Sequence, residues 1–120
     1  MNKYRDKSDF EINKAVAEIY LHGKHLLSEE NQEVYFGGMD GGDFLPNGYF
    51  DPCNNPYDAM PVIIENKICM AYDVFSEERD GGNWVAQPAY GFSDERVRSD
   101  NYYRAAMICF LMMKDAENEK

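Results

Sequence analysis

Residues 105–113 form the longest apolar run of the chain, nine consecutive side chains without a charge. Ser99 or Asp100 can cap a helix that contains this run and extends to about residue 116. A membrane-spanning helix needs about twenty apolar residues, so this one is too short to cross a bilayer. Because it is apolar on every side, we expect it to be buried all round. Its own sheet would cover one side, and a second subunit is a candidate for the other.

A second helix is predicted near the start of the chain. Ser8 and Glu11 have the spacing of a capping box, in which each side chain satisfies a free amide of the first turn. Apolar residues then recur with the 3.6-residue period of a helix until Gly23, a residue type that commonly ends helices. These signals predict a helix over residues 9–22.

A third helix is predicted in the middle of the chain. Asn55 can cap it, and Pro56 suits its first position because the amide that proline lacks is unpaired there. Pro61 lies within the same stretch and removes an internal hydrogen bond. We therefore expect a kink or a restart near Asp58.

Strand predictions rest on short apolar stretches between turn-forming residues. Alternation of apolar side chains is clearest over residues 68–75, and the polar stretch that follows is typical of a hairpin loop. A loop is predicted over residues 40–55, where glycine, proline, Asn and Asp accumulate. The predicted strands are residues 33–39, 68–75 and 84–87, with a further short piece at residues 90–92.

The order of these elements favours an α+β fold. Helix, strand, helix, strand, strand and helix follow one another without a repeat or a linker, which suggests a small, mostly antiparallel sheet packed with helices, similar to an α-β-α sandwich. A chain of 120 residues is close to the commonest size of a single domain. We expect one domain over residues 1–120, with residues 117–120 as a frayed tail.

Charge and cysteine content restrict the partners and the compartment. Acidic residues outnumber basic ones by 22 to 12, a net charge of −10. Such a chain repels nucleic-acid backbones and anionic membrane surfaces, and it suits docking on a basic partner. Cys53, Cys69 and Cys109 are an odd, widely spaced set, which favours reduced thiols in a cytoplasm. The polar residues 1–8 do not resemble a signal peptide.

One local cluster has the chemistry of an anion site. Arg96, Arg98 and Arg104 lie within nine residues at the start of the last helix, and Tyr102 and Tyr103 adjoin Arg104. Guanidinium groups bind phosphate in a bidentate manner, the free amides of a helix start attract anions, and tyrosine rings stack on bases. The cluster therefore suits a small phosphorylated nucleotide.

A plainer interpretation of the same residues stays open. Arg104 can form an ion pair with Asp100 or Glu77 while the other arginines are solvated, since surface ion pairs are common and weak. His22 and His25 have a metal-like spacing but lack nearby further ligands. No catalytic triad, Cys-His pair, P-loop or dinucleotide-binding motif occurs. We expect no enzyme activity, no cofactor and no metal.

Three runs of residues follow one another in a familiar order. Residues 8–17 read SDFEINKAVA, residues 50–64 read FDPCNNPYDAMPVII and residues 104–113 read RAAMICFLMM. They resemble the opening, the central signature and the closing helix of the NinX family of phage and prophage proteins. The resemblance covers almost the whole chain. It implies a phage protein acting in the host bacterial cytoplasm, and it implies no particular activity.

Two positions depart from the NinX pattern. Met60 stands where the family usually has Trp, and Tyr102 and Tyr103 follow Asn101 where Asn-Pro-Leu is common. More distantly, the order of elements resembles the phage ABA-sandwich proteins, a group that includes Thoeris anti-defence sponges. Those proteins sequester a cyclic ADP-ribose-type signal without chemistry. This fold-level resemblance implies a non-enzymatic accessory protein with a counter-defence role.

Three functional hypotheses follow. The first is sequestration of a small nucleotide-derived signal, of the cyclic nucleotide or cyclic ADP-ribose type. The alternative is an acidic inhibitor or adaptor that binds a host protein through exposed aromatic anchors. The third is a homo-oligomer formed through the last helix. The ligand-binding candidates of the first hypothesis are Arg96, Arg98 and Arg104 for phosphate, Tyr102, Tyr103 and Trp84 for stacking, and Asn54 and Asn55 of the central signature.

Overall fold

The computed structural model describes residues 3–40, 43–89 and 96–118, with residues 38–40 and 43–47 described by their backbone alone. None of the described helices is long and apolar enough to cross a membrane. The elements in this part of the chain are α1 (Asp9–Tyr20), β1 (His25–Ser28), β2 (Glu33–Asp40), β3 (Asp43–Tyr49), α2 (Pro56–Glu65), β4 (Ile68–Tyr72), the 3-10 helix η1 (Glu78–Asp80), β5 (Trp84–Pro88), β6 (Val97–Ser99) and α3 (Tyr102–Asn118).

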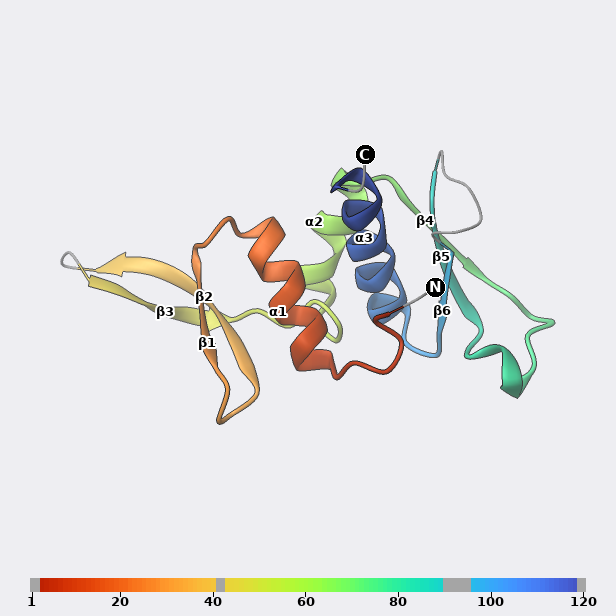
Figure 1. Ribbon diagram of the computed structural model, residues 1–120, viewed down its shortest axis with the longest axis horizontal. Coiled ribbons are helices and arrows are strands. Elements are labelled where there is room, and N and C mark those ends of the chain that lie inside the picture. The colour runs from red at the N-terminus through yellow and green to blue at the C-terminus, as the bar shows by residue number, and fades with distance from the viewer. Residues whose placement is uncertain (1–2, 41–42, 90–95, 119–120) are drawn as a thin grey trace.

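The described strands form two antiparallel three-stranded sheets, β1-β2-β3 and β4-β5-β6, and the helices lie between them (Figure 1). Helix α1 packs on the first sheet, α3 packs on the second, and both α1 and α2 contact α3. The α+β class, with antiparallel strands and packed helices, is thus confirmed. The single sheet expected from the sequence is instead two sheets, and the molecule is elongated, with extents of 53 × 31 × 22 Å.

Helix α3 is the centre of the core. Each of residues 105–111 is 2% exposed or less. Helices α1 and α2 cover one side of α3, and the β4-β5-β6 sheet covers the other (Figure 1). The all-round burial predicted from the apolar run is confirmed for residues 105–111, whereas Met112 and Met113 are partly buried. Because one chain supplies both covers, this burial requires no second subunit, and self-association through α3 stays a separate prediction.

Helices α1 and α2 begin at the predicted caps. The Ser8 hydroxyl accepts a hydrogen bond from the Glu11 amide at 3.2 Å, and α1 ends at Tyr20, two residues before the predicted end. Asn55 caps α2 as predicted. Helix α2 then continues through Pro61 as one helix, so the restart is wrong, while the kink that was the other alternative stays a prediction.

The strand predictions hold better for the second sheet than for the first. Strand β3 occupies residues predicted as loop, because pairing with β2 overrides the turn-forming composition. Strands β1 and β6 were not predicted, and the predicted strand at residues 90–92 lies outside the described residues. Strand β4 ends at Tyr72, three residues early. Helix α3 extends to Asn118, so residues 117–118 are helical rather than frayed.

Candidate functional site

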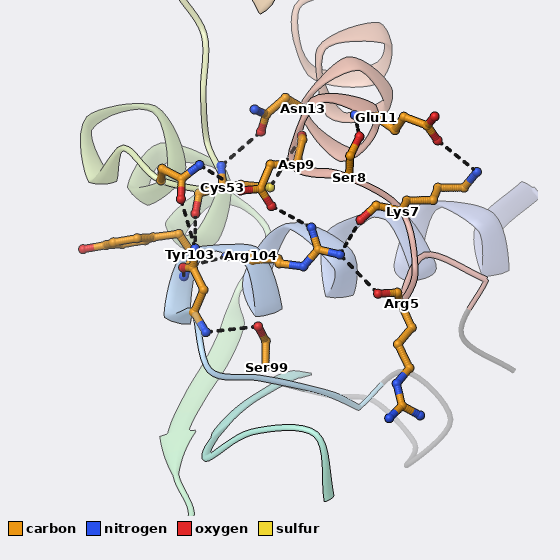
Figure 2. Close-up of polar contacts among 12 residues, drawn as sticks. Arg5, Lys7, Ser8, Asp9, Glu11, Asn13, Cys53, Ser99, Tyr103 and Arg104 are labelled. Carbon is orange, nitrogen blue, oxygen red and sulfur yellow. Dashed lines mark hydrogen bonds and ion pairs between the residues drawn. The ribbon is translucent and has the colours of Figure 1, made fainter. Parts of the chain in front are cut away.

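The guanidinium group of Arg104 forms three hydrogen bonds with the N-terminal part of the chain. Arg104 lies in the first turn of α3, and its side chain is 18% exposed. Its Nη1 donates to Asp9 Oδ1 at 2.7 Å, and its Nη2 donates to the carbonyl oxygens of Lys7 at 2.5 Å and Arg5 at 3.2 Å (Figure 2). The ion-pair interpretation is therefore the observed one, with Asp9 as the partner instead of Asp100 or Glu77.

Asn101 ties the start of α3 to the central signature. Its Oδ1 accepts hydrogen bonds from the backbone amides of Tyr103 at 2.9 Å and Arg104 at 3.2 Å, which is how a helix cap satisfies free amides. Its Nδ2 donates to the carbonyl oxygen of Cys53 at 2.7 Å. Asn101, rather than the expected Ser99 or Asp100, therefore caps this helix.

Helix α1 holds the same segment from the other side. The buried Asn13 donates to Asp51 Oδ1 at 2.8 Å and accepts a hydrogen bond from the Cys53 amide at 3.1 Å. Asn54 donates to Asp9 Oδ2 at 3.0 Å. The network therefore joins α1, the segment before α2, and α3. We call it the polar clamp; it consists of Asp9, Asn13, Asp51, Cys53, Asn54, Asn101 and Arg104.

Burial raises the pKa of two groups in or beside the polar clamp. The Cys53 thiol is inaccessible, and burial raises its pKa, with the Asp9 carboxylate raising it further and Arg104 opposing. A thiol of this kind is a poor nucleophile, because the thiolate is the reactive form. Burial also raises the pKa of Asp58, although its carboxylate accepts a hydrogen bond from the Asp51 amide at 2.9 Å. Both features favour a structural role for the clamp.

The other two candidate arginines do not join Arg104 at a shared site. Arg98, in β6, donates to Asp73 Oδ2 at 2.8 Å and to the carbonyl oxygen of Gly82 at 3.5 Å, so it braces the turn between β4 and β5. The Arg98 guanidinium also holds the pKa of Asp73 below its ordinary value. Arg96 is exposed just before β6. The predicted phosphate-binding set is thus divided among three environments.

The predicted stacking residues contact one another edge to face. Trp84 meets Tyr102 at 4.9 Å between ring centroids, and Tyr102 meets Tyr103 at 5.1 Å. Tyr72, which was not among the candidates, meets Trp84 at 4.9 Å. We call Tyr72, Trp84, Tyr102 and Tyr103 the aromatic row. It runs from the end of β4 across β5 to the start of α3, and it pairs its rings with one another.

Two apolar side chains beyond the aromatic row are exposed on a hydrogen-bonded turn. Val74 is 68% exposed and Phe75 is 88% exposed. The preceding residue, Asp73, accepts a hydrogen bond from the Phe75 amide at 2.9 Å and, through its carbonyl, one from Asn83 Nδ2 at 3.0 Å. We call Val74 and Phe75 the hairpin tip. Asp73 therefore holds the backbone of the turn, and the two apolar side chains on it face solvent.

A cavity of about 480 Å³ lies between α1, β2 and the segment before α2. The candidates Asn54 and Asn55 line it, and the charged groups in its wall are the carboxylates of Asp9, Glu33 and Asp51. Asn55 also uses its Oδ1 to cap α2 through the Tyr57 amide at 3.0 Å. A wall of this charge repels phosphate, so the cavity does not suit the ligand for which the two asparagines were proposed.

Several residues that organise these sites were not among the predicted ones. Asp9, Asn13 and Asn101 carry the polar clamp, and Asp73 organises the hairpin tip. Asn13 and Asp51 did lie within runs that resemble the family motifs, which was the available signal. The pairing of Arg104 with Asp9 had no local signal, because 95 residues separate the two side chains in sequence.

Comparison with known proteins places the chain in a family. No curated protein and no solved structure matches it. The family model described as bacteriophage P22, NinX, matches residues 3–114, a region that contains the complete polar clamp and the hairpin tip. Since this match spans well over half of the chain, the chain belongs to the bacteriophage P22 NinX family.

Proposed function

We propose that this phage protein is a non-enzymatic adaptor or inhibitor that binds a basic host protein through the hairpin tip. The single observation that carries the proposal is the exposure of Val74 and Phe75 on a turn that Asp73 and Arg98 hold in place. Aromatic anchors dominate the binding energy of many protein interfaces. A turn already held in one conformation loses less conformational entropy on binding, which favours affinity.

Charge around the tip favours a basic partner. The turn that follows Phe75 carries the carboxylates of Glu77, Glu78 and Asp80, and all three residues are exposed. Arg79 offsets part of this charge through an ion pair with Glu77 at 3.2 Å. Together with the net charge of −10, these groups attract a positively charged surface and accelerate encounter with it.

The nucleotide-signal hypothesis has less support in the geometry. Arg104 and Arg98 already bind carboxylates and backbone carbonyls, and the cavity beside the clamp is walled by carboxylates. A phosphate would have to displace Asp9 or Asp73 from its guanidinium partner. Burial raises the pKa of the Cys53 thiol, so this thiol does not suit a nucleophilic role.

The test is an affinity capture from lysate of the bacterial host, with the bound proteins identified by mass spectrometry. The tip variant is Phe75→Ser, and the matched control is Tyr57→Ser, which removes an aromatic ring of similar exposure (87%) at the start of α2. We expect a basic protein to be recovered by the wild type and by Tyr57→Ser and to be lost with Phe75→Ser. Circular dichroism checks that both variants fold.

Two outcomes would count against the tip. The first is recovery of the same proteins by the wild type and by Phe75→Ser. The second is calorimetric binding of a cyclic dinucleotide or a cyclic ADP-ribose isomer that Arg96→Ala or Arg104→Met abolishes and Phe75→Ser leaves intact. That second result would favour the nucleotide hypothesis over protein docking.

A further inference from the structure

Strand β4 is an edge strand with an open outer side. The backbone amide of Asp73, the residue directly after β4, donates a hydrogen bond to the Asn83 carbonyl oxygen at 2.8 Å. In the register of β4 and β5, the backbone groups of the odd-numbered residues of β4 therefore point toward β5. Backbone groups alternate along an antiparallel strand, and those of Met70 and Tyr72 therefore point away from β5. Within the described part of the chain, the outer side of β4 has no neighbouring strand.

The other edge strands carry features that discourage strand addition, and β4 does not. Strand β3 contains Pro46 and Gly48, β6 is three residues long with Arg98 at its centre, and β1 is four residues long. Proline, charge and short length are the usual protections of sheet edges. The five residues of β4 read ICMAY, without charge, proline or glycine. An unprotected edge of this kind is a template for another strand.

We propose that a second copy of this chain adds its β4 antiparallel to this edge, so that two three-stranded sheets join into one of six strands. Pairing centred on Met70 joins the outward backbone groups of both copies. It places Ile68 opposite Tyr72 of the partner subunit and Met70 opposite Met70 of the partner subunit, so the outward backbone groups of all three residues have a strand residue opposite. Centring on Cys69 or Ala71 instead would leave Tyr72 or Ile68 of each copy without a strand residue opposite.

This dimer is carried by the strand edge, independently of the function proposed for the hairpin tip. In an antiparallel pair the two copies of β4 end at opposite ends of the sheet. The two hairpin tips, which follow β4 directly, therefore lie far apart and point away from the dimer axis. A dimeric protein would offer two docking points to a partner, and bivalent attachment raises overall affinity.

The experiment measures mass by sedimentation equilibrium and by light scattering over a range of protein concentrations. We expect a dimer of twice the 13.9 kDa chain mass. Met70→Pro removes an amide that points outward, so the ladder within the chain keeps its hydrogen bonds. The matched control, Met70→Ala, loses the side chain and keeps the amide. We expect Met70→Pro to raise the dimer dissociation constant at least tenfold above Met70→Ala, since two hydrogen bonds are lost per dimer.

A charge variant tests the same pairing without proline. Ala71→Lys puts a charge on the exposed face of the edge and should also weaken the dimer. A wild-type chain that is monomeric at millimolar concentration would overturn the proposal. So would a folded Met70→Pro or Ala71→Lys variant that dimerises as tightly as the wild type. Retained capture of a host protein by a monomeric variant would leave the tip proposal intact.

Discussion

Replacing Arg104 by Met tests whether its guanidinium group has a structural role or is available to a ligand. The substitution keeps most of the side-chain stem and removes three hydrogen bonds, one to the Asp9 carboxylate and two to backbone carbonyls. A hydrogen bond to a charged group contributes about 1.5–3 kcal/mol when it is well shielded. The two carbonyl contacts are exposed and Asp9 is partly exposed, so the lower end applies. We expect a loss of about 2–4 kcal/mol.

Denaturation measurements can resolve an effect of this size. For a domain of this length a loss of 1 kcal/mol lowers the melting temperature by about 4 °C, so the expected decrease is about 8–16 °C. Urea unfolding followed by far-ultraviolet circular dichroism gives the free energy of unfolding. A double-mutant cycle with Asp9→Asn should give a coupling energy of about 1 kcal/mol or more, because the two side chains are in direct contact.

Arg96→Met is the matched control, since Arg96 is exposed. We expect its free energy of unfolding to stay within about 0.5 kcal/mol of the wild type. The reasoning would be refuted if Arg104→Met behaved like Arg96→Met and showed no coupling to Asp9. In that case the guanidinium group would contribute nothing to the fold, and a ligand-binding role for it would again be the better explanation.

Three further predictions follow from the geometry. Gly82→Ala should cost about 2–4 kcal/mol in urea unfolding, because Gly82 has φ +136° and a Cβ there would lie 2.2 Å from the Ser99 carbonyl carbon; a loss below that of an ordinary surface variant would contradict it. Burial raises the pKa of Asp58 above 3.8, so its contribution to stability is present below that pH and is lost as the pH rises through the folded-state value. The unfolding free energy of Asp58→Asn relative to the wild type should therefore increase from pH 4 to pH 7, and a decrease would refute the argument. Iodoacetamide should label the exposed Cys69 alone in the native protein and all three cysteines after unfolding, as counted by mass spectrometry. Labelling of Cys53 or Cys109 in the native protein as fast as Cys69 would contradict their burial.

Local signals in the sequence predicted the parts of the fold that depend on near neighbours. Ser8 and Asn55 cap helices because their side chains reach amides two or three residues away. The apolar run of residues 105–113 predicted a buried helix, since a side chain without polar groups loses little on leaving water. The loop prediction for residues 43–49 failed because composition cannot register pairing with β2.

The sequence predicted some of the residues of the candidate site, but it did not predict which side chains contact one another there. Arg104, Arg98 and Trp84 were identified from their spacing, but their partners Asp9, Asp73 and Tyr72 were not. Each partner is brought into contact by chain segments that meet after folding. Whether a guanidinium group is free or neutralised depends on that contact, so the phosphate-binding interpretation rested on information that the local sequence does not hold.

By itself, the sequence determined the α+β class, the central apolar helix, two of the helix caps and membership of the NinX pattern, because each depends on periodicity or on residues close together in the chain. The tertiary structure decided that one chain buries α3 on both sides, that the strands divide into two sheets, and that Arg104 is held by a carboxylate 95 residues away. It also decided which strand edge and which apolar side chains face solvent. Those outcomes depend on the packing of distant segments, and local propensity does not encode that packing.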